Sequence, residues 1–204
     1  ITGATSSPLF YNTQGTFTIV WTFDDGNGNI TTQNQTVIVD DTIAPIADLA
    51  SLPTITGQCS ATVTAPSATD TCAGTIIGTT SSPLSYNTQG TYTIVWTFND
   101  GIGNITTQNQ TVIVDDTIAP IPVVAFLPTI TGQCSATVTA PTATDTCAGS
   151  ITGTTSSPLS YNTQGTYTIV WTFNDGNGNT STQNQTVIVD DTIAPIADLA
   201  SLPT

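Results

Sequence analysis

Residues Thr91–Asp100 read TYTIVWTFND, and this segment decides the fold class. Its bulky residues Tyr92, Ile94, Trp96 and Phe98 alternate with Thr and Val. Side chains of a β-strand point alternately to its two faces, so this pattern is typical of a half-buried strand with Trp in the core. The segment recurs as TYTIVWTFND at Thr166–Asp175 and as TFTIVWTFDD at Thr16–Asp25. We therefore predict the same strand three times.

The recurrence extends over the whole chain, in which Trp21, Trp96 and Trp171 are each 75 residues apart, so one repeat has 75 residues. Residues 54–115 and 129–190 differ at only six positions, so we expect the units to do the same work. The connectors vary more, because residues 47–51 read ADLAS and residues 122–126 read PVVAF. The period predicts four parts: residues 1–41 as the C-terminal part of a repeat, residues 42–116 and 117–191 as complete repeats, and residues 192–204 as the first strand of a further repeat.

The chain begins and ends inside a repeat, and two explanations stay open. The sequence is either a window cut from a longer array, or its partial domains complete each other between subunits by strand donation.

The sequence around the aromatic segment predicts further short strands and no helix. Residues 99–104 form a turn by composition, and Ile105–Val114 follows as a partner strand. Upstream, Cys59–Ala65 and Thr75–Thr80 are predicted strands. The strong helix formers Glu, Lys, Arg and Met are absent, while β-branched residues are abundant. Six or seven short strands in each repeat predict an all-β chain of tandem β-sandwiches.

The charge composition excludes several kinds of partner. The chain has no Lys, Arg or His, and its 14 acidic residues give a net charge of −14. Nucleic acid and anionic membrane surfaces are therefore not expected as partners. No stretch is apolar for long enough to insert into a membrane. No catalytic set that needs His can form, so we predict that the chain is not an enzyme. Repulsion between like charges favours an extended rod or filament.

The four cysteines form two equivalent pairs with the same short spacing along the chain: Cys59 with Cys72, and Cys134 with Cys147. This spacing is not that of a zinc site. In a secreted chain the simplest expectation is one disulfide within each repeat, where closing a loop of about 14 residues stabilises by roughly 3 kcal/mol. The alternative is pairing between neighbouring repeats, for instance Cys59 with Cys147.

The order of these motifs resembles that of the hyalin-repeat (HYR) module. The matching features are a CSATVTAPxATDxCAG segment, Gly90-Thr91 before the aromatic strand, a turn at Asp100–Asn104, and DTIAP at Asp116–Pro120. The turn is one residue longer than the family pattern, and Gln108–Gln110 stands where many animal members have a further Cys. The resemblance implies an immunoglobulin-like fold and an extracellular or cell-surface role in adhesion or scaffolding, without catalysis. Similar arrays occur in large bacterial surface adhesins and extracellular filaments of the Bacteroidota type.

No cofactor is required by the sequence, and calcium is the candidate. In an immunoglobulin-like array, the last strand of one domain ends near two loops of the next, so acidic and amide side chains should gather there. Carboxylate and carbonyl oxygens are the ligands that calcium prefers. The alternative is that these residues only form turns, which Asp, Asn and Gly favour. The predicted ligands are Asp40, Asp41, Asp70, Asp100 and Asn104 at one junction, and Asp115, Asp116, Asp145, Asp175, Asn177 and Asn179 at the next.

Two functions remain. The first is a structural stalk or filament, which associates with itself or with neighbouring repeats. The second is an adhesive module that binds cell-surface glycans or a protein, with calcium. The loops hardly vary while the connector does, and this favours the stalk. In the connector, Val123, Val124 and Phe126 form a predicted assembly surface; they could equally pack under their own domain.

Overall fold

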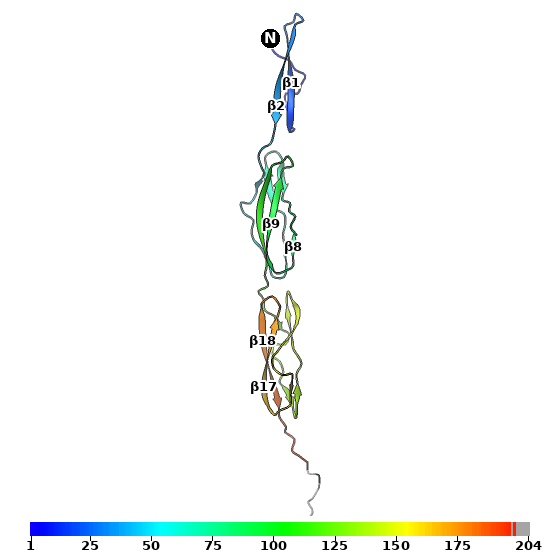
Figure 1. The fold of residues 1–204 in the computed structure, drawn as a ribbon, viewed down its shortest axis with the longest axis vertical. Coiled ribbons are helices and arrows are strands. Elements are labelled where there is room, and N and C mark those ends of the chain that lie inside the picture. The colour runs from blue at the N-terminus through cyan, green and yellow to red at the C-terminus, as the bar shows by residue number, and fades with distance from the viewer. Residues whose placement is uncertain (197, 199–204) are drawn as a thin grey trace, which may run out of the picture. The chain divides into compact units, whose positions relative to one another are not determined.

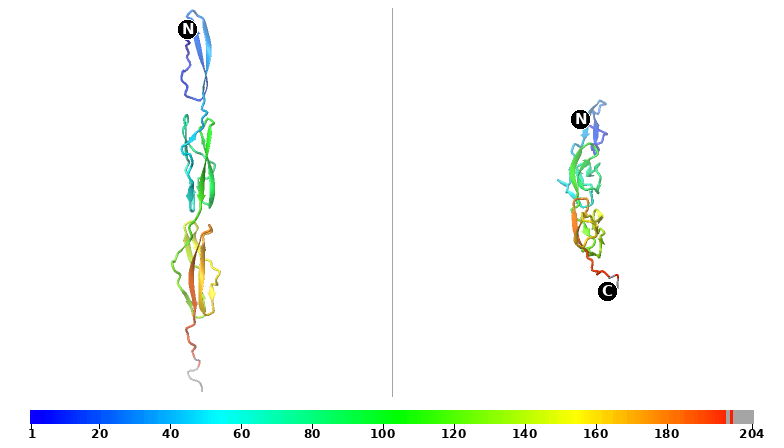
Figure 2. Two further views of the ribbon diagram at one scale, coloured as in Figure 1. Left: turned by 90° about the vertical axis from the view of Figure 1, so that its left-hand side faces the viewer. Right: turned by 60° about the horizontal axis from the view of Figure 1, so that its bottom comes forward.

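The computed structural model describes residues 1–196 and 198, and every regular element within them is a β-strand (Figures 1 and 2). This confirms the predicted all-β class. No helix in the described part of the chain is long and apolar enough to cross a membrane. Most of the predicted strand of residues 192–204 falls on positions 197 and 199–204, which lie outside the described residues.

The chain divides into two compact units. Unit 1 contains residues 1–53, 64–82 and 94–110, and unit 2 contains residues 54–63, 83–93 and those from Thr111 onward. The partial repeat of residues 1–41 therefore belongs to unit 1 and the repeat of residues 117–191 to unit 2. The repeat of residues 42–116 contributes to both, because its strands β9 (Gly90–Asn99) and β10 (Ile105–Val114) each pass through both units.

Two sheets lie entirely within unit 1. Strands β1 (Gly15–Asp24) and β2 (Ile30–Val39) form an antiparallel pair along their whole length. Strands β3 (Ile46–Ala47), β6 (Ser67–Asp70) and β7 (Gly74–Ile77) form an antiparallel sheet in the order β3-β6-β7. The predicted strand at Thr75–Thr80 thus begins and ends earlier than expected.

Unit 2 contains the rest of the second repeat and all of the third. Strand β4 (Ile55–Gly57) lies parallel to Val112–Val114 of β10, and β5 (Ala61–Thr62) is antiparallel to β8 (Ser85–Tyr86). The predicted strand at Cys59–Ala65 is therefore reduced to two residues. The third repeat contains β11 (Ile121–Pro122), β12 (Ile130–Gly132), β13 (Ala136–Thr137), β14 (Thr142–Asp145), β15 (Gly149–Thr152), β16 (Ser160–Tyr161), β17 (Gly165–Asn174) and β18 (Thr180–Val189).

The core of the third repeat confirms the predicted strand pattern. Ile169, Trp171 and Phe173 of β17 are buried together with Val187 and Val189 of β18. The same cluster contains residues from the smaller sheets, namely Ala136, Val138, Ala143 and Tyr161. The apolar side chains therefore fill the space between sheets, as in a β-sandwich. Trp96 of the second repeat is equally buried, with 1% exposure.

The turn that connects β9 to β10 requires glycine for conformational reasons. Gly101 and Gly103 have φ angles of 84° and 122°, a region that favours glycine, and nothing lies within 4 Å of where a Cβ would be. The turn is thus shaped by backbone conformation and by the side chains of Asp100 and Asn104, which also lie at the candidate site.

Candidate functional site: the ends of successive repeats

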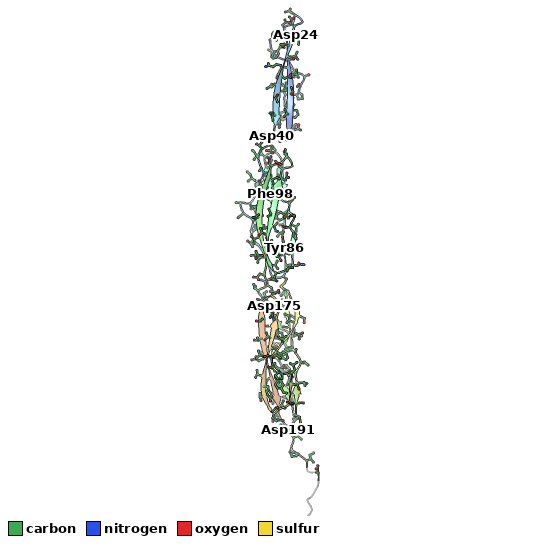
Figure 3. All side chains as sticks on the ribbon, in the orientation of Figure 1. Asp24, Asp40, Tyr86, Phe98, Asp175 and Asp191 are labelled. Atoms are coloured by element: carbon green, nitrogen blue, oxygen red, sulfur yellow. A yellow bond between two sulfur atoms is a disulfide. The ribbon has the colours of Figure 1, made fainter. Side chains whose placement is uncertain are left out.

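The turn after β17 is held by the carboxylate of Asp175, which is labelled in Figure 3. Its Oδ1 accepts hydrogen bonds from the backbone N–H of Asn177 (2.7 Å) and Asn179 (3.1 Å), and its Oδ2 accepts one from Asn179 Nδ2 (2.7 Å). Burial is the largest single influence on the pKa of Asp175 and raises it, but these hydrogen bonds together lower the pKa below its usual value. The Asp175 carboxylate therefore has a structural role in the turn.

Asp100 does the same in the turn after β9. Its Oδ1 accepts from the backbone N–H of Ile102 (2.8 Å), Gly103 (3.1 Å) and Asn104 (3.1 Å). The hydrogen bond from Ile102 is the largest influence on the pKa of Asp100, and the pKa is lowered. In both turns the Asn that closes the turn keeps one amide proton for a second contact.

That second contact joins the turn to the end of the preceding repeat. Asn104 Nδ2 donates to the backbone oxygen of Asp41 (3.0 Å), and Asn179 Nδ2 donates to the backbone oxygen of Asp116 (2.8 Å). Asn177 Nδ2 also donates to Asp116 Oδ2 (3.2 Å). The second Asp of each Asp-Asp pair is therefore fixed by amide side chains, as the predicted juxtaposition requires.

Each of these aspartates belongs to a cluster of three side chains whose ligand atoms lie within 4.8 Å of one another. One cluster contains Asp41, Asp70 and Cys72, and lies in unit 1. The other contains Asp116, Asp145 and Cys147, and lies in unit 2. We call them the Asp41 cluster and the Asp116 cluster.

The carboxylates of the clusters are buried and incompletely hydrogen-bonded. Asp41, Asp70 and Asp116 are 8%, 5% and 3% exposed. The Oδ2 atoms of Asp41, Asp70 and Asp145 are buried without a hydrogen-bond partner. Buried carboxylate oxygens without a donor are costly unless a cation neutralises them, so this donor set fits a hard divalent cation.

The structure brings together most of the predicted calcium ligands, and two of them lie outside the clusters. Asp40 and Asp115 are exposed and belong to neither cluster. Asp115 instead donates its backbone N–H to Gly57 O (2.9 Å). Of the two aspartates in each pair, only the second points to the site, because successive residues of an extended chain face opposite sides. Asp40 and Asp115 therefore lie outside the two clusters.

The cysteines pair between repeats, and the expectation of a disulfide within each repeat is wrong. Cys59 is bonded to Cys147, 88 residues along the chain, and Cys72 and Cys134 carry free, exposed thiols. The reason is that Cys59 and Cys147 belong to the same compact unit, unit 2, whereas Cys72 belongs to unit 1. Cys59 follows Gly57, which contacts Asp115 after the end of β10, whereas Cys72 lies in the Asp41 cluster, close to Asp100, before β10 begins.

Local contacts place Cys59 beside its partner. A Cβ on Gly57 would lie 1.9 Å from Ser60 O, so only glycine permits the tight turn that leads into Cys59. Gln89 Nε2 donates to Gln58 O (3.0 Å), and Gln89 Oε1 accepts from the backbone N–H of Asp116 (2.8 Å). Gln89 therefore links the cysteine turn to the Asp116 cluster. This glutamine was not among the predicted site residues, although its recurrence as Gln14, Gln89 and Gln164 was a signal.

The acidic surroundings of Cys72 affect its thiol. Partial loss of water around the Cys72 thiol is the first cause that raises its pKa. The negative charge of Asp41 and a hydrogen bond to Asp41 come next, followed by the charges of Asp70 and Asp100. The thiol is therefore protonated at neutral pH. Its equivalent, Cys147, has no thiol because it is in the disulfide.

The predicted assembly surface is exposed. Val123, Val124 and Phe126 are 59%, 50% and 88% exposed, so these side chains do not pack under their own domain. Leu127, the next residue, does pack against the core. The assembly role of the three exposed residues stays a prediction.

The third repeat can be related to a known family. Residues 122–189 match the model of the HYR-like domain with 4 cysteines. This supports the predicted resemblance for the HYR-like module of residues 117–191, in which the matched segment contains two cysteines, Cys134 and Cys147. No curated protein matches the chain in sequence.

Solved structures similar to the chain include a protocadherin, a desmocollin ectodomain and an adhesin. The protocadherin gammaB7 EC3-6 cis-dimer structure has 12% identity and a TM-score of 0.35, with 85% of this chain and 59% of that chain covered. The human desmocollin-1 ectodomain has 14% identity and a TM-score of 0.29, with 93% and 47% covered. A Ca2+-stabilized adhesin of an Antarctic bacterium that binds ice has 17% identity and a TM-score of 0.28, with 86% and 56% covered. The chain thus spans about half the length of these proteins.

Proposed function

We propose that this chain is a structural repeat region of a secreted or cell-surface protein and forms an extracellular stalk or filament. The observation that carries the proposal is the disulfide between Cys59 and Cys147, which joins one repeat covalently to the next. A chain that only displayed independent binding modules would gain little from such a bond. A stalk gains resistance to pulling, because the residues between the two cysteines cannot be extended.

The surrounding features support the same role. The repeats are almost identical, and amide side chains of one repeat hold the backbone of the preceding one. A disulfide is typical of secreted proteins, which supports an extracellular location. The composition, without His, Lys, Arg or Glu, supports a role that involves no catalysis.

Single-molecule pulling tests the stalk. The cysteines are 88 residues apart, so breaking the disulfide should release roughly 300 Å of additional chain at about 3.4 Å per residue. We expect this release in the Cys147→Ser variant and after reduction, and not in the oxidised wild type. The Cys134→Ser variant is the matched control, because it removes one of the two free thiols and keeps the disulfide, and it should behave as wild type. Equal extension of oxidised wild type and Cys147→Ser would overturn the proposal.

We also propose that the two clusters bind calcium. The residues that would hold it are Asp41 and Asp70 in one cluster, and Asp116 and Asp145 in the other. Its binding would neutralise the buried oxygens that have no donor, and would stiffen the connection between repeats. The sulfur of Cys147 is not a ligand in this proposal, because it is in the disulfide.

Calorimetric titration with calcium, together with melting in calcium and in chelator, tests this part. We expect Asp70→Asn and Asp145→Asn each to remove one binding event and part of the calcium-dependent rise in Tm. Asp40→Asn and Asp115→Asn remove the same charge at exposed positions next to the clusters, and should bind calcium as wild type does. Equal losses in all four variants would indicate a general charge effect and contradict the assignment.

A further inference from the structure

The turn after β17 contains the dipeptide Asn177-Gly178, whereas the equivalent turn of the second repeat has Ile102 in place of the asparagine. Asparagine followed by glycine is the dipeptide most prone to deamidate, because glycine has no side chain to hinder the backbone nitrogen that attacks the amide carbon. The sequence contains one other such dipeptide, Asn27-Gly28. The turn after β17 is thus a candidate site of spontaneous covalent modification.

The structure leaves this dipeptide open to the reaction. Asn177 and Gly178 are both exposed, and nothing lies within 4 Å of where a Cβ on Gly178 would be. Asn177 also borders a hollow of about 350 Å³, which Cys59, Cys147 and Gln89 help to line. Water therefore reaches the amide of Asn177, and no neighbouring atom obstructs the approach of the Gly178 nitrogen.

The other reactive side chains of the same turn are protected. The amide of Asn179 donates both to Asp116 O (2.8 Å) and to Asp175 Oδ2 (2.7 Å), and a β-branched residue follows it in the sequence. Asp175 is followed by glycine, but its carboxylate accepts three hydrogen bonds. An ionised carboxylate is a poor target for attack by the backbone nitrogen. Asn177 is therefore the reactive residue of the turn.

We propose that Asn177 is a deamidation site whose product adds a carboxylate to the Asp116 cluster. The backbone nitrogen of Gly178 attacks Cγ of Asn177 and forms a cyclic succinimide. The proton of that nitrogen and the side-chain NH₂ leave together as ammonia. One water molecule then opens the ring at either of its carbonyls and yields aspartate or isoaspartate. The reaction takes up one water and releases one ammonia, and it needs no oxidant or other reactant.

The new carboxylate replaces a hydrogen-bond donor at the cluster. In the structure, Asn177 Nδ2 donates to Asp116 Oδ2 (3.2 Å). Both products lack this donor and add a negative charge beside Asp116 and Asp145, and Asp145 Oδ2 is already buried without a partner. Three carboxylates repel one another unless a cation lies between them. Deamidation therefore makes this end of the repeat depend on a divalent cation.

This consequence rests on the proposed calcium binding and extends the Asp116 cluster by one carboxylate. The Asp41 cluster has no such route, because Ile102 has no amide to lose. The two clusters therefore diverge as the protein ages. The Asp116 cluster gains charge and affinity for cations, whereas the Asp41 cluster keeps its two carboxylates.

Incubation of the folded full chain in heavy-oxygen water at neutral pH tests the modification, since the water that opens the ring leaves its oxygen in the product. Asn27→Gln is introduced in every sample, so that only one Asn-Gly dipeptide remains. We expect mass spectrometry of proteolytic peptides to find heavy oxygen at Asn177. Asn109 is also exposed but precedes a glutamine, and should stay unlabelled.

Two variants make this test specific to the dipeptide. Ile102→Asn places an asparagine before Gly103 in the equivalent turn and should add labelling at position 102. Asn177→Gln keeps an amide but should stay unlabelled, because its longer side chain closes a ring far more slowly. An unlabelled Asn177, or equal labelling of Asn177 and Asn109, would overturn the proposal.

Melting and calcium titration test the consequence. Asn177→Asp reproduces the aspartate product, and Asn177→Gln is its uncharged control. In chelator, we expect Asn177→Asp to melt roughly 2–4 °C below Asn177→Gln, because it lacks a donor to Asp116. It should also bind calcium roughly tenfold more tightly, since ligand charge sets the affinity of such sites.

The outcomes separate this inference from the proposed function. Equal calcium affinity of Asn177→Asp and Asn177→Gln would overturn the link between deamidation and the Asp116 cluster. If the fresh chain binds no calcium while Asn177 still takes up heavy oxygen, the calcium proposal fails and the modification site stands.

Discussion

The Asp41 cluster and the Asp116 cluster are built from the same residue types but differ in two ways. Cys72 of the Asp41 cluster is a free thiol, whereas Cys147 of the Asp116 cluster is in a disulfide. Asp41 Oδ2 has no partner, whereas Asp116 Oδ2 accepts from Asn177. The loop that carries the cysteine is nevertheless hydrogen-bonded in the same way in both. The loop conformation is therefore set by Asp70 and Asp145, and the disulfide secures an arrangement that exists without it.

The largest expected effect comes from removing that bond. Cys147→Ser should lower the free energy of unfolding by about 4–5 kcal/mol, because the disulfide restricts a loop of close to 90 residues in the unfolded chain. The measurement is denaturant unfolding of the oxidised protein. Cys72→Ser is the matched control at the equivalent position and should unfold as wild type does. A comparable loss of stability in both variants would show that each cysteine stabilises its own loop, and that the disulfide is not the cause.

The second difference has a cause in the sequence, because Ile102 stands where the Asp116 cluster has Asn177. Ile102→Asn should supply a donor to Asp41 Oδ2 and raise the free energy of unfolding by about 1 kcal/mol in chelator. Asn177→Ile should lower it by a similar amount, by leaving Asp116 Oδ2 unpaired. Denaturant unfolding of both variants checks this exchange. If both changes move stability in the same direction, the contact between Asn177 and Asp116 does not explain the difference.

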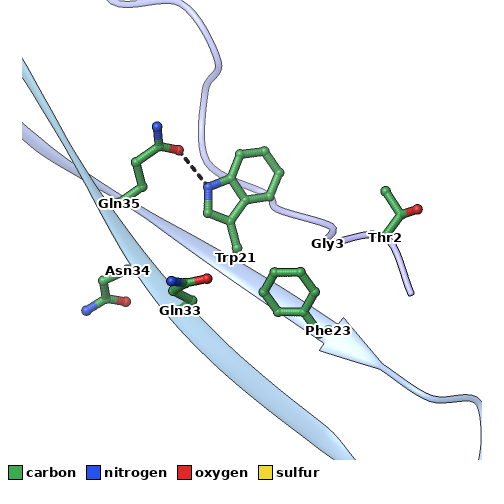
Figure 4. Close-up of a pocket in the computed structure, with 7 residues that line it drawn as sticks. All are labelled: Thr2, Gly3, Trp21, Phe23, Gln33, Asn34 and Gln35. Carbon is green, nitrogen blue, oxygen red and sulfur yellow. Dashed lines mark hydrogen bonds between the residues drawn. The ribbon is translucent and has the colours of Figure 1, made fainter.

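These two differences show which features a sequence can predict. The long strands were predictable because Tyr92, Ile94, Trp96 and Phe98 alternate over a full strand length, and the structure places β9 around them. The meeting of Asp41 with Asp70 followed from the repeat order. The disulfide did not, because the short separation between Cys59 and Cys72 along the chain favours local pairing, whereas the fold brings Cys59 together with Cys147 in unit 2. The burial of Trp21 was not predictable in the same way, because Trp21 and Trp96 stand in nearly the same sequence. Trp21 is half-buried and its indole N–H donates to Gln35 Oε1 (2.8 Å) (Figure 4), whereas Trp96 is 1% exposed.

The connectors at residues 47–51 and 122–126 differ in a carboxyl group, and we expect this difference to affect stability at low pH. Hydrogen bonds from the hydroxyl of Ser67 first and then of Thr69 lower the pKa of Asp48 below its usual value, and Val123 occupies this position in the third repeat. The pKa of the Asp48 carboxyl is lower in the folded state than its value of 3.8 in the unfolded chain, so the ionised carboxylate stabilises the folded state at pH values above 3.8. This stabilisation is lost as the pH falls through the lower pKa of the folded state. Asp48→Val should therefore flatten the dependence of Tm on pH below about 4.

The control for this prediction is Asp40→Asn, which removes an exposed carboxyl for which no such hydrogen bonds exist among the described residues. Its Tm should depend on pH as that of wild type does. An unchanged profile in Asp48→Val would mean that the bonds from Ser67 and Thr69 persist when the carboxyl is protonated.

The smallest effect on stability is expected at Phe126, where the second repeat has Ser51. Phe126 is 88% exposed, so Phe126→Ser should change the free energy of unfolding by less than about 0.5 kcal/mol. If Val123, Val124 and Phe126 form an assembly surface, the same variant should lower self-association in sedimentation experiments, because the loss of an exposed aromatic side chain weakens an apolar contact between chains. Ser51→Phe is the reciprocal variant and should strengthen association. Unchanged sedimentation in both variants, with stability intact, would show that the connector is not an assembly surface. The hydrogen bonds of Asp48 would then be the remaining structural difference between the connectors ADLAS and PVVAF.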